Sequence, residues 1–99
     1  MALTREVFDR MQTHHPAAKL MAEWLSRHDP VEWNILDVAA ALGVSRAEAQ
    51  AAYHWMVHTA RRWVVTPRHM IVHMPADSEM RAMFVESRGG TPKPSKVKK

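Results

Sequence analysis

Residues 41–63, ALGVSRAEAQAAYHWMVHTARRW, join a glycine and a serine to an alanine-rich segment that ends in two arginines. Gly43 is typical of the left-handed residue that ends a helix, and Ser45 with Glu48 three residues later has the S-x-x-E pattern of a capping box. The segment therefore predicts two helices that meet at a tight turn. The second of them would run from Ser45 to about Arg62, and its alanines would offer little bulk to a core.

Three helices are expected before this turn. Thr4 can cap the first, which ends near Gln12 or Thr13, and Pro16 suits the first position of the second, which ends near Arg27. Asn34 can cap the third, with Asp37 in its first turn. The buried stripes expected on these helices are Val7, Phe8 and Met11, then Leu20, Met21, Trp24 and Leu25, then Ile35, Leu36, Val38, Ala39 and Leu42. Between the second and third helices, Val31 to Trp33 predicts a short edge strand.

The pattern changes to β-branched and apolar runs after the long helix. The runs RWVVT and HMIVHM flank TPRH and predict a hairpin from Trp63 to Met74, with Pro67 setting the turn and Arg68 at its tip. Alternation places Met70, Val72 and Met74 on the buried face. Asp77 or Ser78 can cap a last helix to about Glu86, with Met80, Met83 and Phe84 as its apolar stripe.

The composition favours one small globular domain. The chain has 99 residues, of which 46% are hydrophobic, and it has no cysteine, so disulfides and thiolate metal sites are excluded. No run approaches the 18 or so apolar residues of a membrane span. The first ten residues include charged side chains where a signal peptide would need an apolar segment. We expect a soluble, cytoplasmic protein. Glycine-rich phosphate loops, nucleophile elbows and paired carboxylates are missing from the sequence, so we do not expect an enzyme or a bound cofactor.

Positive charge is concentrated in two places. The net charge is +4, but the segment from Arg88 to Lys99 holds five basic residues and no acidic one, while the preceding residues hold nine basic and ten acidic. Within that nearly neutral body, Ser45 to His69 contains four arginines against Glu48 alone. Such local concentrations indicate a polyanionic partner more strongly than the net charge does.

The residues VAAALGVS, 38–45, resemble the core of bacterial helix-turn-helix motifs. Ala39 is small enough for close helix crossing, Gly43 makes the turn and Val44 anchors it from below. The motif covers about Ile35 to Arg62, and the order of elements from about Pro16 to Met74 resembles a winged helix domain, as in small bacterial or phage transcriptional regulators. The resemblance implies a mostly helical fold with a small β-hairpin, divided into a flanking helix (1–15), the winged core (16–74), a C-terminal helix (75–87) and a disordered basic tail (88–99).

The resemblance also implies how the protein would bind double-stranded DNA. The helix from Ser45 to Arg62 would enter the major groove, where Arg46 is suited to guanine and Gln50 to adenine. Other residues would contact the DNA without reading bases. These are His54 facing the groove, Ser45, Arg61 and Arg62 at phosphates, Arg68 of the wing at a phosphate or in the minor groove, and Lys93, Lys96, Lys98 and Lys99 as non-specific contacts.

Several alternatives stay open from the sequence. The nearly neutral body favours a protein-interaction module on the same scaffold, such as a phage inhibitor of a host protein or an assembly subunit, and single-stranded DNA or RNA is a third partner class. Arg61 and Arg62 equally suit the C-terminal end of any helix. The four histidines His54, His58, His69 and His73 would form a zinc site only if the helix and the hairpin met, and we predict no metal. The apolar stripes of the two flanking helices predict that these helices form the interface of a homodimer, the dimer seam.

Overall fold

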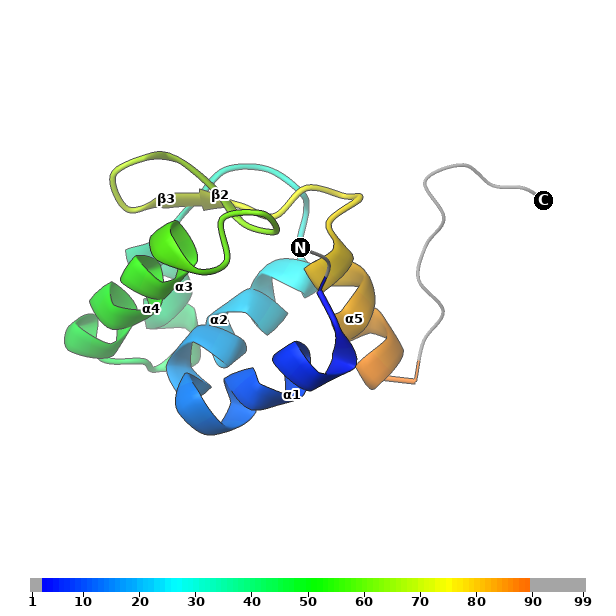
Figure 1. Cartoon of the computed structure of the whole chain (residues 1–99). Helices are drawn as coiled ribbons and strands as arrows, with labels where there is room; N and C mark the ends of the chain where they lie inside the picture. Colours follow the sequence, from blue (N-terminus) through cyan, green and yellow to red (C-terminus); the bar gives the residue numbers. More distant parts are fainter. Residues whose placement is uncertain (1–2, 90–99) are drawn as a thin grey trace.

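The computed structural model of the chain describes residues 3–89 and contains five helices and three short strands. In chain order these elements are α1 (Arg5–His14), α2 (Pro16–Arg27), β1 (Trp33–Asn34), α3 (Ile35–Leu42), α4 (Arg46–His58), β2 (Val65–Arg68), β3 (Ile71–His73) and α5 (Glu79–Ser87). The mostly helical class with a small hairpin is thereby confirmed. In Figure 1 the hairpin lies above α3 and α4 at one end of the molecule, and α1 and α5 lie at the other. No helix among residues 3–89 has the length and apolarity needed to cross a membrane.

The helix ends follow the local signals in the sequence. The Thr4 and Asn34 side chains accept hydrogen bonds from the backbone N–H groups of Val7 and Leu36, as N-caps do. Gly43 ends α3 in the left-handed conformation with φ of 72°. Ser78, and not Asp77, caps α5. Each of these interactions spans only a few residues, which explains why the sequence predicts them.

Helix α2 is the central helix and packs against α1, α3, α4 and α5. Its buried stripe is Ala18, Met21, Ala22 and Leu25, a repeat of three and four residues. The expectation that Leu20 is buried was wrong, because 47% of its surface is exposed. Two of its members are alanines, whose small side chains permit close approach of a neighbouring helix such as α4. Leu20 lies on the opposite side of α2 and is therefore outside the core.

The sheet has the strand order β1-β3-β2, with β3 in the middle and antiparallel to both neighbours. The predicted buried face is confirmed for Val72 and Met74, which are buried, but Met70 lies in the turn and is half-buried. The predicted turn was wrong. Pro67 lies within β2, which is an edge strand, and proline is tolerated there because an edge residue need not donate a hydrogen bond to a neighbouring strand. Arg68 pairs with Ile71 across a two-residue turn. That turn consists of His69 and Met70, and Met70 takes the left-handed φ of 63°.

Helix α4 is shorter than predicted and ends at His58, so Arg61 and Arg62 lie beyond it. The N–H of Ala60 donates to the carbonyl of Trp55, and the following residues form turns that carry Trp63 back into the core. The indole N–H of Trp63 donates to Glu79 Oε1 at 3.1 Å, and its carbonyl accepts from Ser78 Oγ at 2.9 Å. Burial of Trp63 against the start of α5 therefore ends the helix earlier than its local sequence indicates.

The two flanking helices pack on each other within one chain. The rings of Phe8 and Phe84 meet edge to face with centroids 4.8 Å apart, and Arg5 bonds to Ser87 and pairs with Glu86. Phe8, Met11, Met80 and Phe84 are all buried. The apolar surface that predicted a dimer seam is thus covered within the chain, and the homodimer stays a prediction without that support. Arg88, predicted as the first residue of the tail, caps α5 and donates to Ser26 Oγ at 2.9 Å.

Candidate nucleic-acid interface

One side of α4 faces outward and carries polar side chains separated by small ones. Arg46, Gln50 and His54 follow one another at intervals of four residues, which places them along one side of a helix, and all three are exposed. Ala47 and Ala51 are exposed beside this row, on the side that faces the start of α2. The opposite side of α4 is buried and holds Ala49, Ala52, Tyr53, Trp55 and Met56. The outward side therefore carries polar and small side chains over its first turns, and the half-buried Val57 follows on the same side near the end of the helix.

The start of α4 is held by a reciprocal pair of hydrogen bonds. Ser45 Oγ accepts from the N–H of Glu48 at 3.1 Å, and Glu48 Oε1 accepts from the N–H of Ser45 at 3.2 Å. This confirms the capping box that the sequence predicts. Glu48 is the only acidic residue of α4, and its carboxylate is engaged at the helix start. Arg46 follows Ser45 directly and forms no ion pair among residues 3–89.

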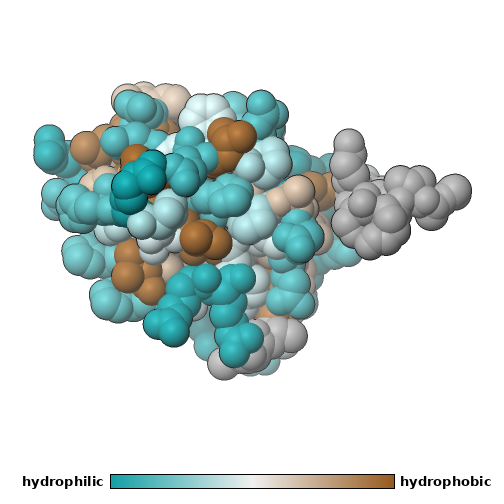
Figure 2. Space-filling view, turned by 90° about the horizontal axis from the view of Figure 1, so that it is seen from above, coloured by the Kyte–Doolittle hydropathy of each residue, from teal (hydrophilic) through white to brown (hydrophobic). Residues whose placement is uncertain are grey.

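The hairpin lies beside the middle of α4. The hydroxyl of Tyr53 donates to the carbonyl oxygen of Arg68 at 3.2 Å, and the Tyr53 ring meets the ring of His69 at 5.7 Å between centroids. The same ring lies 6.3 Å from that of His54 on the outward side of the helix. Seen from above, the side of the molecule on which the hairpin lies is mainly hydrophilic, with separated apolar side chains (Figure 2). The guanidinium of Arg68 is exposed but pairs with Glu32, which reduces the charge it presents.

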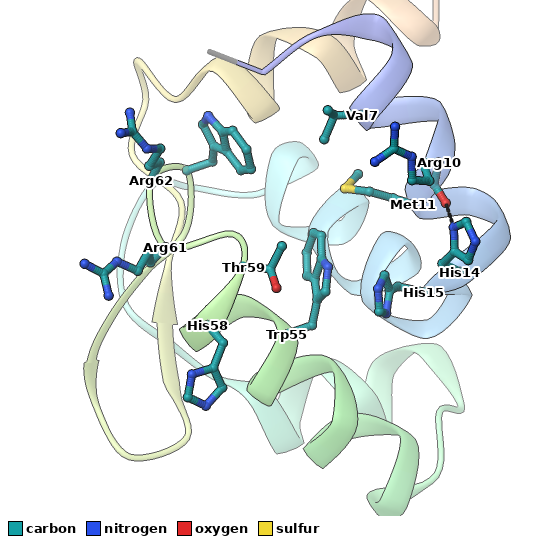
Figure 3. Close-up of a pocket in the computed structure, with 11 residues that line it drawn as sticks. Val7, Arg10, Met11, His14, His15, Trp55, His58, Thr59, Arg61 and Arg62 are labelled. Carbon is teal, nitrogen blue, oxygen red and sulfur yellow. Dashed lines mark hydrogen bonds between the residues drawn. The ribbon is translucent and has the colours of Figure 1, made fainter. Parts of the chain in front are cut away.

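Arg61 and Arg62 lie apart from the other predicted residues, at the far end of α4. They line a cleft of about 590 Å³ formed by α1, the end of α4 and the turn that follows it. Arg10, His14 and His15 contribute from α1 and its connection to α2. Figure 3 shows Arg10 and His15 facing α4, whereas the His14 ring lies farther out, beside the carbonyl oxygen of Arg10. No local pattern in the sequence indicates this cleft, because it depends on packing between segments at least 40 residues apart. Neither Arg61 nor Arg62 forms an ion pair within residues 3–89.

The histidines of the helix and hairpin do not converge. The His54 and His58 rings stack in parallel with centroids 6.1 Å apart, while His73 Nε2 lies 3.0 Å from the carbonyl oxygen of Pro30. In the described part of the chain no three histidine or carboxylate side chains lie close enough to hold a metal ion. The predicted contacts Lys93, Lys96, Lys98 and Lys99 lie outside the described residues. The chain matches no protein-family model, no curated protein and no solved structure.

Proposed function

We propose that the protein is a small transcriptional regulator that binds double-stranded DNA in a sequence-specific manner through a winged helix domain. The chain order α2, β1, α3, α4, β2, β3 and the sheet order β1-β3-β2 support this fold. In such a domain α4 is the recognition helix and the hairpin is the wing. The major groove is about 12 Å wide and admits one α-helix.

The observation that carries the proposal is the outward side of α4. Exposed alanines leave room for the groove walls, while Arg46 and Gln50 are long enough to reach base edges. A cation in the first turn of a helix opposes the helix dipole, so a negative partner such as DNA would compensate the unfavourable position of Arg46. In this proposal Arg46 reads guanine and Gln50 reads adenine, each pair contributing about 1–3 kcal/mol of discrimination.

The remaining contacts would set position and affinity. Ser45 presents a hydroxyl and a helix start to one phosphate, and His54 faces the groove. Arg61 and Arg62 neutralise the backbone beyond the end of α4. Arg68 reaches DNA only if its pair with Glu32 opens, so we assign it a smaller role. The tail lysines add affinity that does not depend on sequence.

The test is DNA binding by three variants, measured by fluorescence anisotropy on duplexes selected from a random pool. Arg46→Ala should weaken binding to the selected site by about 1–3 kcal/mol and relax preference at one base pair. Arg27→Ala is the control, because Arg27 is also exposed but lies on α2 and pairs with Glu23. A chain ended after Gly89 should lose affinity equally for all sequences. Failure of the full chain to bind any duplex at low salt would refute the proposal.

A protein-interaction module is the second candidate, and an aromatic surface on α2 favours it. The Trp24 ring stacks on His28 with centroids 3.6 Å apart and meets Trp33 edge to face at 5.0 Å. Leu20 lies one turn before Trp24 and is exposed, as is Val31 near Trp33. Both tryptophans are half-buried, and tryptophan is among the residues that most often anchor protein interfaces. This candidate would be favoured if the full chain binds no DNA and the Leu20→Ser variant loses binding to a protein partner.

A further inference from the structure

The cleft between α1 and the end of α4 has an apolar floor. Val7 and Met11 contribute from α1 and Trp55 from α4 (Figure 3), and Trp63 lines the cleft from the turn that follows α4. Trp55 and Trp63 have 8% and 6% of their surfaces exposed, so only a small part of each indole reaches the cleft. The floor is thus built from the molecule's own core residues. A volume of about 590 Å³ falls within the range of sites that hold small organic molecules.

The rim of the same cleft is basic. It is formed by three arginines and three histidines, and none of the described residues that line it is acidic. These basic residues are Arg10, His14, His15, His58, Arg61 and Arg62. In Figure 3 the Arg10 guanidinium points toward the floor, whereas Arg61 and Arg62 extend away from it on the opposite side. Arg10 also pairs with Glu6 at 3.4 Å, but the Glu6 side chain is 83% exposed and lies outside the cleft.

We infer that this cleft binds an aromatic anion, an organic molecule with a flat apolar body and one carboxylate, sulfonate or phosphate group. The flat body fits a floor of two indole edges and the Met11 thioether, both of which favour contact with aromatic rings. The anionic group meets Arg10, whose planar guanidinium pairs with carboxylates in a fixed geometry. The floor alone would accept any apolar molecule, and the rim alone any anion. The two together select molecules that carry both features.

Calorimetric titration of the full chain with naphthoate tests this inference. Naphthoate should bind with one-to-one stoichiometry, at least tenfold more tightly than the neutral naphthalenemethanol and than inorganic phosphate. Arg10→Gln should weaken naphthoate binding about tenfold, because it removes one charge-assisted hydrogen bond. Arg27→Gln is a matched control, since Arg10 and Arg27 are both 55% exposed and each pairs with a glutamate four residues before it. This control should leave binding unchanged.

A second variant tests the location without removing charge. Thr59 lines the cleft and is exposed, so Thr59→Phe should fill the space and reduce naphthoate binding more than tenfold while the thermal unfolding midpoint is retained. The inference is overturned if naphthalenemethanol or phosphate binds as tightly as naphthoate. It is also overturned if the folded Thr59→Phe protein binds normally, or if Arg27→Gln matches Arg10→Gln. The titrations contain no DNA, so their outcome does not depend on the proposed regulator function.

Discussion

The hydroxyl of Tyr53 donates to the carbonyl oxygen of Arg68 at 3.2 Å and thereby joins the middle of α4 to the end of β2. The Tyr53 ring is buried against the core, so the hydroxyl holds the hairpin in a fixed position relative to the outward side of the helix. A recognition helix and a wing must keep such a fixed relationship if both are to contact one duplex.

Tyr53→Phe should loosen the hairpin while the ring packing is kept. We expect a loss of about 0.5–1.5 kcal/mol in the free energy of unfolding, measured by urea denaturation, because one partly buried hydrogen bond is removed. Amide hydrogen exchange should become faster in β2 and β3 and stay unchanged in α1 and α5. Uniform acceleration over all elements would contradict a local role for this bond.

Ser45→Asp separates helix capping from DNA binding. Aspartate caps helices as well as serine does, and its charge favours the helix start, so stability should be equal or slightly higher. A carboxylate at the proposed phosphate contact should nevertheless weaken duplex binding by about tenfold or more through repulsion. Ser45→Ala should show the reverse, with about 1 kcal/mol of stability lost and a smaller effect on DNA. If the Ser45→Asp variant binds DNA as tightly as the unchanged chain, Ser45 does not contact the DNA.

Arg61 and Arg62 should act through the DNA backbone. Replacing both with glutamine should lower the slope of log affinity against log salt by roughly 1 to 2 units, as expected for the loss of one or two phosphate contacts. The preference among base pairs should stay as it is, because these residues lie beyond the end of α4. Arg27→Gln should leave the slope unchanged. A change in sequence preference in the double variant would show that this end of the chain reads bases.

The sequence predicted those features that depend on neighbouring residues. Thr4, Asn34 and Ser45 were recognised as caps because a side-chain oxygen and the amide it binds lie only two or three residues apart. Gly43 was recognised because a left-handed helix end favours glycine. The outward position of Arg46 and Gln50 also followed from helical spacing, once the start of α4 was known.

Features that depend on distant contacts were misjudged. The end of α4 is set by Trp63, which bonds to Glu79 and so stops the helix after His58. The hairpin turn lies past Pro67, at His69 and Met70, because Arg68 still pairs with Ile71 in the ladder of β2 and β3 and Met70 takes the left-handed conformation. The basic cleft was not foreseen because Arg10 and Arg61 come to line one cleft only through packing of the whole domain. Hydrophobic periodicity identifies which face of a helix is buried, but it does not identify the element that packs against that face.

Arg81 joins the end of α2 to the loop before α5. Its guanidinium donates to the carbonyl oxygens of Ser26, His28, Met74 and Pro75. Burial, together with the charge of Arg88, lowers the pKa of Arg81 from its usual value, and Asp29 opposes this shift. A lowered pKa in a base means that the folded state disfavours its charged form. Arginine stays charged throughout the neutral range, so this cost does not vary between about pH 6 and pH 9.

Arg81→Met should therefore destabilise the fold by about 2–3 kcal/mol, because four carbonyl groups lose a charged donor and part of the site is shielded from water. Arg81→Lys should have an intermediate effect, since an ammonium group cannot reach four acceptors spread around a planar fork. Urea denaturation measures both, with Arg27→Met as the control, for which a change below about 0.5 kcal/mol is expected at an exposed ion pair. The difference between Arg81→Met and Arg27→Met should be the same at pH 6 and pH 8. Equal stability of these two variants would show that the bonds of Arg81 contribute no more than a surface pair.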